Sequence, residues 1–520
     1  MSLPVEEQGT ARRPRPSRPS WAVTWGQGRG AGGASIFVPW LQPLALPERV
    51  RSLRRQRLLD EVGRLDKVAP RRIALAYPSP YRVGMSSLGY QQIYRTIQGL
   101  AETSCERFFL PDGEDAGTDG RALGYEFDRT LSEYPLIALS VAYELELAGV
   151  INLLDKSGIP ARANERDGRH PLILAGGPLT FSNPIPLGAL CDAVVMGEAE
   201  ELVAPVLDAA FGATDRASAL RALAALPHVW VPSLHGEALP SLGLASNALL
   251  PACSTILTPH TELSGMFLVE AERGCSRGCA YCVMRRSTNG GMRIIPKETV
   301  LARIPEGTRK VGLVGAAVSD HPAISDIVRT LADRGMEVGL SSLRPDKVRP
   351  ELVEQLARVG YKTLTTALDG TSERMRGIVD RRGHEEHYRR AAQLVRESRL
   401  ERLKLYLMIG VPTETEEDVD ECIRFVGELS RICPVSLGVS PFCSKRNTPL
   451  DRQPYAGIQL VQSRLERLRR GLQGRAEVRA TSAKWAWVEY VLAQGGLAEG
   501  HAVVEAVRAG GGFGDYRKAF

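Results

Sequence analysis

Three cysteines, Cys275, Cys279 and Cys282, stand close together in the segment Glu-Arg-Gly-Cys-Ser-Arg-Gly-Cys-Ala-Tyr-Cys. Their spacing, C-x3-C-x2-C, allows three thiolates to ligate three irons of a cubane cluster. A ferredoxin-type carrier would need a fourth cysteine nearby and a structural zinc site four Cys or His ligands, whereas the next cysteines downstream are Cys422 and Cys433. The fourth iron is therefore expected to take its ligand from outside the protein.

The cysteine segment follows directly on a predicted strand, Phe267–Ala271, which opens an alternation of strands and helices. A full eight-unit barrel takes about 250 residues, so residues 266–440 have room for about six βα units. The pattern predicts an α/β fold with a partial (β/α)6 barrel, and it places the cysteines at the carboxyl end of the first strand, the active face of such barrels. The later strands are predicted at Val311–Gly315, Val338–Ser341, Thr363–Ala367, Leu403–Ile409 and Val435–Ser440.

A second set of short apolar runs lies upstream and predicts a Rossmann-like, doubly wound parallel sheet. Its strands are expected at Ile73–Tyr77, Leu136–Ala142, Leu172–Ala175 and Ala193–Met196. Gly176 and Gly177 follow the third of these strands, and Gly197 follows the fourth. Residues without a Cβ at strand ends let a bulky ligand approach the backbone, although tight turns require glycine too.

Composition divides the chain into five parts. Residues 1–35 are rich in Pro, Arg, Gly and Ser and are predicted to form a disordered basic tail. A basic helix at Ile458–Leu472 carries several arginines, which are expected to form a solvated face. The remaining parts are a Rossmann-like domain at 36–226, a linker at 227–260, the barrel at 261–450 and a helical extension at 451–520.

Composition also excludes several functional classes. The net charge of +6 is small for a chain with 66 basic and 60 acidic residues, so nucleic-acid binding is possible but not indicated. Nine irregularly spaced cysteines do not suggest a disulfide framework, and the sequence shows neither a long apolar run nor a signal peptide. We therefore expect a cytoplasmic protein that does not span a membrane.

On these residues the sequence resembles the radical S-adenosylmethionine superfamily, whose cysteine loop carries an aromatic residue before the third cysteine, here Tyr281. The resemblance implies that S-adenosylmethionine chelates the open iron of a [4Fe–4S] cluster, and that an electron from the reduced cluster cleaves it to a 5′-deoxyadenosyl radical. That radical would abstract hydrogen from a substrate that the motif does not identify. The resemblance also implies a flavodoxin or ferredoxin as electron donor.

The same resemblance implies cofactor contacts at the ends of the barrel strands. Members of the superfamily often have a Gly-Gly-Glu after the second strand that holds the methionyl amine. This chain has Val-Gly-Ala-Ala there, so backbone carbonyls near Gly315 are expected to substitute. A salt-bridged helix start explains Glu373 and Arg376 equally well, and an ordinary turn explains Gly410. The implied contacts on the barrel are Tyr281, Gly315, Ser342, Arg344, Asp369, Glu373, Arg376 and Gly410.

The amino-terminal half resembles the subgroup, with uncharacterised members, in which a cobalamin-binding-like domain precedes the barrel. The matching segments are Tyr77–Gly89, Ala175–Pro178 and Val195–Glu198. Many cobalamin domains carry an Asp-x-His-x-x-Gly that supplies the lower axial ligand, but none of the eight histidines here has Asp two positions before it. Either cobalamin binds without a histidine ligand, or the fold persists without the cofactor.

Two other functions stay open at this point. If cobalamin binds, methyl transfer to an unactivated carbon or phosphorus becomes the leading reaction, and the purified protein should show a corrinoid spectrum. A cluster-bearing redox sensor or scaffold would hold iron and sulfide without cleaving S-adenosylmethionine.

Overall fold

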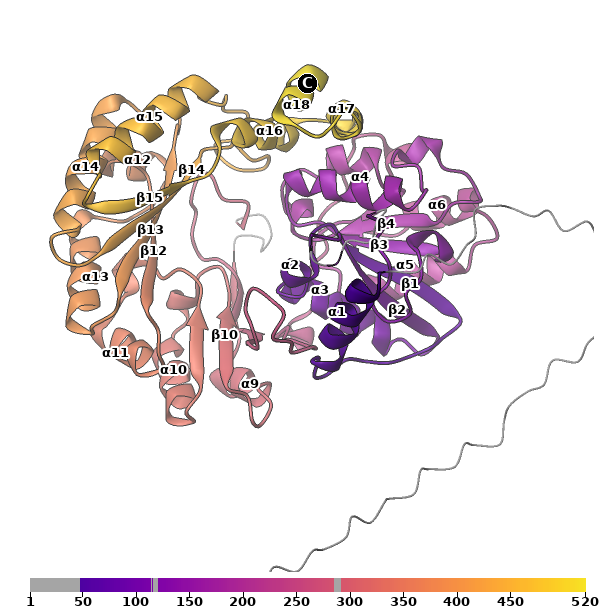
Figure 1. The fold of residues 1–520 in the computed structure, drawn as a ribbon, viewed down its shortest axis with the longest axis horizontal. Helices are drawn as coiled ribbons and strands as arrows, with labels where there is room; N and C mark the ends of the chain where they lie inside the picture. The colour runs from indigo at the N-terminus through magenta and orange to yellow at the C-terminus, as the bar shows by residue number, and fades with distance from the viewer. Residues whose placement is uncertain (1–46, 114, 116–119, 285–290) are drawn as a thin grey trace, which may run out of the picture. The chain divides into compact units, whose positions relative to one another are not determined.

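The computed structural model describes residues 47–113, 115, 120–284 and 291–520 (Figure 1). The predicted tail at 1–35 lies outside these ranges. Residues Leu46–Phe520 form one compact unit that contains both predicted sheets.

The amino-terminal domain is built on a six-stranded sheet in the order β2-β1-β3-β4-β5-β6. Its strands are parallel except β6, which pairs antiparallel with β5. Helices on both faces cover two separate apolar cores, as in a doubly wound fold. The strands are β1 (Arg71–Tyr77), β2 (Thr103–Phe109), β3 (Leu136–Ser140), β4 (Leu172–Gly176), β5 (Ala193–Val195) and β6 (Val229–Trp230). The helices are α1 (Glu48–Leu59), α2 (Tyr81–Gly84), α3 (Leu88–Gly99), α4 (Leu147–Lys156), α5 (Val203–Phe211), α6 (Arg216–Ala224) and α7 (Pro232–His235).

Two strands of this sheet differ from the prediction. Strand β2 is buried along its whole length although it contains Glu106 and Arg107. Arg107 is fully buried and pairs with Glu61 and Glu126 at 2.8 and 2.6 Å, so its charge is balanced inside the domain. Strand β6 lies inside the predicted linker, which is therefore part of the fold: Cys253 in the same segment also forms an antiparallel bridge to Val269 of the barrel.

The carboxyl-terminal half contains the predicted open barrel. Two parallel sheets, in the orders β7-β10-β11 and β12-β13-β14-β15, are joined by a parallel bridge between Leu343 and Thr366. Alternate side chains along these strands pack with the helices in one extensive apolar core. The strands are β7 (Phe267–Glu270), β10 (Lys310–Val314), β11 (Glu337–Leu340), β12 (Thr363–Asp369), β13 (Arg402–Ile409), β14 (Val435–Pro441) and β15 (Ala476–Ala480).

Helices α10, α11, α13 and α14 lie along the outer side of these strands (Figure 1). A capping box starts α14, in which the Thr415 amide donates to Asp418 at 2.8 Å. None of the helices in the described ranges is long and apolar enough to cross a membrane. The helices of this half are α9 (Lys297–Ala302), α10 (Ile324–Asp333), α11 (Pro350–Arg358), α12 (Glu373–Ile378), α13 (Glu385–Glu397), α14 (Glu416–Leu429) and α15 (Ile458–Gly471).

The sequence predicted a helical carboxyl-terminal extension, but the extension also contains a strand. Strand β15 adds a parallel strand to the barrel, and alternate residues along it are exposed, as at a sheet edge. The helices that follow, α16 (Ala483–Gln494), α17 (Leu497–Arg508) and α18 (Phe513–Ala519), contribute side chains to an apolar core of the amino-terminal domain. The extension thus contributes to both halves.

Candidate functional site

The three cysteines lie in the loop of a β-hairpin. Strands β8 (Glu272–Gly274) and β9 (Met292–Ile294) pair antiparallel, and the chain between them carries Cys275, Cys279 and Cys282. The hairpin follows directly on β7, the first barrel strand. The loop therefore stands at the carboxyl edge of the barrel sheet, where the sequence placed it.

Buried ion pairs fasten both strands of this hairpin. Arg273 on β8 pairs with Glu270 and Glu200 at 2.8 Å and with Glu198 at 3.3 Å. Arg293 on β9 also contacts Glu198. Glu198 follows Gly197, after strand β5 of the amino-terminal domain. The amino-terminal domain therefore contacts the hairpin that carries the cysteine loop. Arginine, with its fork of donors, suits such a shared contact.

The donor set fits an iron–sulfur cluster. Burial raises the pKa of the Cys275 and Cys282 thiols, and the Arg277 amide, which donates to Cys275 Sγ at 3.4 Å, opposes the shift. Iron would bind these side chains as thiolates and displace their protons. Within the described ranges, no group of three or more His, Cys, Asp or Glu side chains could hold a metal ion. A cubane binds each thiolate through a different iron, so its ligands need not converge on one point.

The far side of the loop is tied to the turn after α12. The Ala280 amide donates to the Val379 carbonyl at 3.0 Å, and Tyr281 lies beside Asp369 at the end of β12, where each raises or lowers the pKa of the other. Asp369 also lies 3.0 Å from Arg381 Nε, and Arg381 Nη1 lies 3.9 Å from Cys279 Sγ. One cation thus stands between a buried carboxylate and a candidate cluster ligand.

Two buried carboxylate oxygens around the loop, Glu272 Oε2 and Asp320 Oδ1, have no partner in the described ranges, whereas Asp369 Oδ2 pairs with Arg381 Nε. Burial raises the pKa of all three groups, that of Glu272 to about 7. Glu272 Oε1 accepts from the Ala317 amide at 2.6 Å, and Asp320 Oδ2 accepts from Ser276 at 3.2 Å. Unmatched acceptors beside the thiols fit a ligand that carries positive charge.

Two cavities adjoin the cysteine loop and share Arg277, Arg344 and Asp346. The larger, of about 640 Å³, is lined by Ser276, Arg277, Met292, Ile294, Asp320, Arg344, Asp346 and Lys347. The smaller, of about 10 Å³, is lined by Arg277, Cys279, Arg344, Pro345, Asp346, Asp380, Arg381, Arg382 and Gly383. Cations outnumber acids in both linings.

Some predicted cofactor contacts lie near the loop. Gly315 packs against Glu272, since an added Cβ would lie 2.2 Å from Oε1, and its carbonyl accepts from Ser341 Oγ at 3.0 Å. Arg344 is buried and pairs with Asp320 and Asp346 at the wall of the larger cavity. Ser342, which lies between Gly315 and Arg344 in the sequence, is partly exposed. Their predicted contacts with S-adenosylmethionine stay predictions.

Three others make contacts within the protein. Glu373 starts α12 and pairs with His384 at 2.7 Å, while Arg376 is fully buried and donates from Nε to the Gly383 carbonyl at 2.8 Å. These contacts support the helix-start alternative for both. The Gly410 amide donates to Glu414 at 2.7 Å, and its φ of 79° suits a strand-to-helix turn.

Two of the three strand-end glycines of the amino-terminal domain are packed closely against the protein's own backbone. A Cβ at Gly177 would lie 2.7 Å from the Val141 carbonyl oxygen, and one at Gly197 would lie 2.5 Å from the Gly243 carbonyl oxygen. Gly176 has ordinary spacing, with Val195 O at 3.5 Å. Their positive φ and these backbone contacts agree with the tight-turn explanation for Gly177 and Gly197, and the predicted approach of a corrin stays a prediction.

Other side chains fill the same sheet edge. Glu146, before α4, accepts from the Ala142 amide at 2.6 Å, which places a carboxylate at that helix start. Lys445, after β14, bonds Glu144 and Glu489 at 2.8 Å. Neither these residues nor Arg381 were predicted from the sequence. An acidic pair before a helix is a detectable signal, whereas its partners come from far along the chain.

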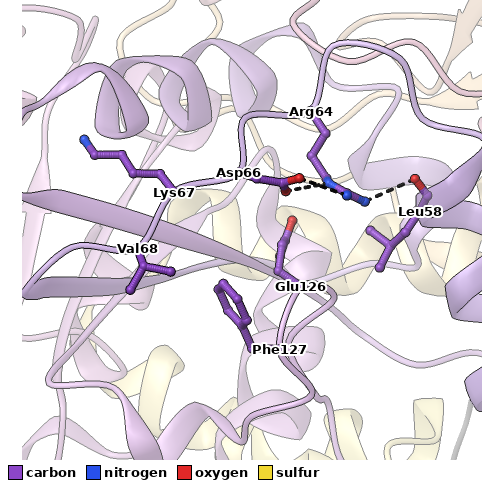
Figure 2. A pocket seen from close by; sticks show the side chains of 7 residues that line it. All are labelled: Leu58, Arg64, Asp66, Lys67, Val68, Glu126 and Phe127. Carbon is purple, nitrogen blue, oxygen red and sulfur yellow. Dashed lines mark hydrogen bonds and ion pairs between the residues drawn. The ribbon is translucent and has the colours of Figure 1, made fainter. Parts of the chain in front are cut away.

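One more cavity, of about 250 Å³, lies on the amino-terminal domain beside α1. Figure 2 shows Arg64 turned toward Asp66 and the Leu58 carbonyl, at 2.7 and 3.1 Å. The Arg64 charge is thus matched within the chain.

Two family models match the chain and together cover more than half of it. The model described as "Radical SAM proteins, N-terminal" matches residues 89–232, and the model "Radical SAM superfamily" matches residues 269–426. The second match includes the cysteine hairpin and most of the barrel.

Individual proteins are similar at lower identity. An uncharacterized protein of Methanocaldococcus jannaschii, MJ0966, is 24% identical over 74% of this chain and 80% of its own. The ribosomal protein uS12 methylthiotransferase RimO of Leptospira biflexa is 26% identical over 35% of this chain, and the match spans only 42% of RimO. The solved structure of OxsB, a cobalamin-dependent S-adenosylmethionine radical enzyme with aqua-cobalamin bound, aligns with a TM-score of 0.49 at 12% identity, over 76% of this chain and 55% of OxsB.

Proposed function

Because the chain belongs to the radical S-adenosylmethionine superfamily of enzymes, we propose that it holds a [4Fe–4S] cluster on Cys275, Cys279 and Cys282 and acts on a substrate not yet identified. When reduced and bound to S-adenosylmethionine, the cluster would supply the electron that gives a 5′-deoxyadenosyl radical. The observation that carries the proposal is the presence of all three thiols in one hairpin loop at the carboxyl edge of the barrel.

The protein's own contribution is to hold this loop still. Arg273 and Arg293 fix the two hairpin strands through Glu198, and the Ala280 amide fixes the far side of the loop through Val379. Preorganisation matters because a thiolate held in place does not have to be ordered when the cluster assembles.

Two unpartnered carboxylate oxygens beside the loop favour a ligand that brings a cationic donor. S-adenosylmethionine carries a sulfonium and an ammonium, and one buried oxygen each of Glu272 and Asp320 is an acceptor without a donor among the described residues. We assign the ammonium to the neighbourhood of Asp320, which lines the larger cavity and contacts the cysteine loop through Ser276. This carboxylate follows β10, where the Gly-Gly-Glu is missing.

We propose an acidic flavodoxin or ferredoxin as the electron donor. Five cations, Arg277, Arg344, Lys347, Arg381 and Arg382, line the two cavities beside the loop, against three acids. Complementary charge speeds the encounter of proteins, and salt screens it. The rate of cluster reduction by such a donor should therefore fall as the salt concentration rises.

Cobalamin is not part of this proposal. Contacts with the protein's own backbone explain Gly177 and Gly197, and no step is assigned to cobalamin. A corrinoid absorption spectrum in protein purified from cells supplied with cobalamin would restore the methyltransferase alternative.

The test is anaerobic reconstitution with iron and sulfide, followed by dithionite reduction and assay of 5′-deoxyadenosine formed from S-adenosylmethionine. We expect about four irons per chain, as a cubane requires, and a change in the electron paramagnetic resonance spectrum on adding S-adenosylmethionine. The triple variant of Cys275, Cys279 and Cys282 to alanine should hold no cluster. Cys433→Ala, which removes a buried core thiol, is the matched control and should hold one.

Two outcomes would contradict the proposal. A wild-type protein without bound cluster would remove its basis. A cluster whose spectrum does not respond to S-adenosylmethionine would favour the sensor or scaffold alternative.

A further inference from the structure

Arg381 occupies an unusual place beside the cysteine loop. Its side chain is 17% exposed, and Nη1 lies 3.9 Å from Cys279 Sγ, within hydrogen-bonding distance for sulfur. Burial lowers the pKa of Arg381, but Asp369, Tyr281 and Cys279 together outweigh it, so the net shift is upward and the guanidinium stays charged. A permanent cation therefore faces one candidate cluster ligand.

The backbone fixes this cation relative to the loop. The Arg381 amide donates to the Arg376 carbonyl at 2.7 Å, and its own carbonyl accepts from the Gly383 amide at 2.7 Å. Two residues before Arg381, the Val379 carbonyl accepts from Ala280, which is the neighbour of Cys279. The turn that carries Arg381 is thus hydrogen-bonded to the loop that carries Cys279.

Asp369 holds the other side of the guanidinium. It ends β12 with a φ of 61°, an uncommon conformation that Asp and Asn tolerate better than most residues. Its side chain is 10% exposed and contacts both Arg381 and the Tyr281 hydroxyl. The cation therefore stands between two groups that are negative once Cys279 binds iron.

We infer that Arg381 and Asp369 are positioning residues that set the reduction potential of the cluster, acting in opposite directions through Cys279. This inference rests on the proposed function. Reduction adds one electron to the cluster, and a cation at a ligand sulfur stabilises the added negative charge, whereas a nearby carboxylate opposes it. The partial burial of the pair limits screening by water.

The experiment is a potentiometric titration of the reconstituted full chain, followed by electron paramagnetic resonance. Arg381→Met leaves Asp369 uncompensated, so we expect the potential to fall, with about a tenfold change in the one-electron reduction equilibrium, or about 59 mV. Asp369→Asn keeps the backbone conformation and removes the charge, so the potential should rise. Arg381→Lys should restore most of the Arg381→Met shift.

The neighbouring cation Arg382, whose side chain is 77% exposed, provides the matched control. Arg382→Met should shift the potential far less than Arg381→Met, because solvent screens an exposed charge. Iron content is measured for every variant. If a variant fails to assemble its cluster, the remaining charge variants still test the sign of the effect.

Three results separate the two hypotheses. Opposite shifts for Arg381→Met and Asp369→Asn support the inference. Equal potentials in all variants, with wild-type iron content, overturn it and leave the proposed function intact. Absence of a cluster in the wild type overturns both.

Discussion

The amino-terminal sheet and the barrel differ in how the charged groups at their carboxyl edges are paired. At the amino-terminal edge, Glu146 accepts from a backbone amide and Lys445 bonds Glu144 and Glu489. At the barrel edge, Glu272 and Asp320 each keep one buried oxygen without a partner in the described ranges. One edge is closed by the chain's own groups, and the other has acceptors to offer a ligand.

Glycine does not distinguish these edges. Gly177 in the first and Gly315 in the second are both packed against the protein itself. Three thiols in one loop, beside unmatched carboxylates, occur only at the barrel edge among the residues that the structure describes. The chemistry of the side chains therefore locates the reactive edge, and the backbone glycines do not.

The largest expected effect tests how tightly the amino-terminal edge is closed. Gly177→Ala should lower the free energy of unfolding by about 3 kcal/mol, because the φ of 109° is strained for alanine and the new Cβ meets the Val141 backbone. Gly176→Ala is the control and should cost less than about 1 kcal/mol, since its Cβ has ordinary spacing. Chemical denaturation measures the unfolding free energy of both variants. Equal losses would mean that the backbone around Gly177 can shift to accommodate a Cβ.

The sequence predicted most of the barrel because its strands are apolar and its helices are strongly amphipathic. It missed strands whose stability depends on distant partners. Arg107 in β2 is buried only because Glu61 and Glu126 reach it from other segments. Strand β15 lies at a sheet edge and is half exposed, so it lacks the apolar run that marks a buried parallel strand.

The site was predictable where the signal is local. The spacing of Cys275, Cys279 and Cys282 located the hairpin loop without any structure. The role inferred for Arg381 was hidden, since its contact with Cys279 joins residues 102 positions apart. Charged residues are common on surfaces, and only the fold shows which of them face a thiol.

Next in size is the pH dependence that the barrel edge should impose on stability. Burial raises the pKa of Glu272 from an ordinary value of 4.5 to about 7, so the folded chain binds a proton that the unfolded chain has released between these values. The stability contributed by this group is therefore full below pH 4.5 and is lost as the pH rises toward 7, by about 2–3 kcal/mol. Unfolding of the cluster-free protein at several pH values should show this slope.

The matched variant for that slope is Glu272→Gln, which cannot titrate. Its unfolding free energy should lack the part of the pH dependence that belongs to Glu272. An identical slope in variant and wild type would show that the Glu272 carboxylate is ionised inside the fold, and that the barrel edge is better solvated than its burial indicates.

A smaller effect is expected where the two edges are bonded to each other. Lys445→Met removes the partner of Glu144, whose side chain is 3% exposed, and should lower the free energy of unfolding by about 2 kcal/mol. The partial exposure of Lys445 keeps the loss below that of a fully buried pair. Adding Glu144→Gln to Lys445→Met should recover part of the stability, as a double-mutant cycle would measure.

The smallest expected effect is at the start of a barrel helix, α14. Thr415 caps α14 through the reciprocal contact with Asp418, so Thr415→Ala should cost about 1 kcal/mol of unfolding free energy. Because this contact is local and complete, the loss should not change between about pH 5 and 7, in contrast with that of Glu272. Thermal unfolding of the cluster-free variant measures it. A loss that varied with pH would mean that the stability of α14 depends on the protonation of Glu272 at the barrel edge.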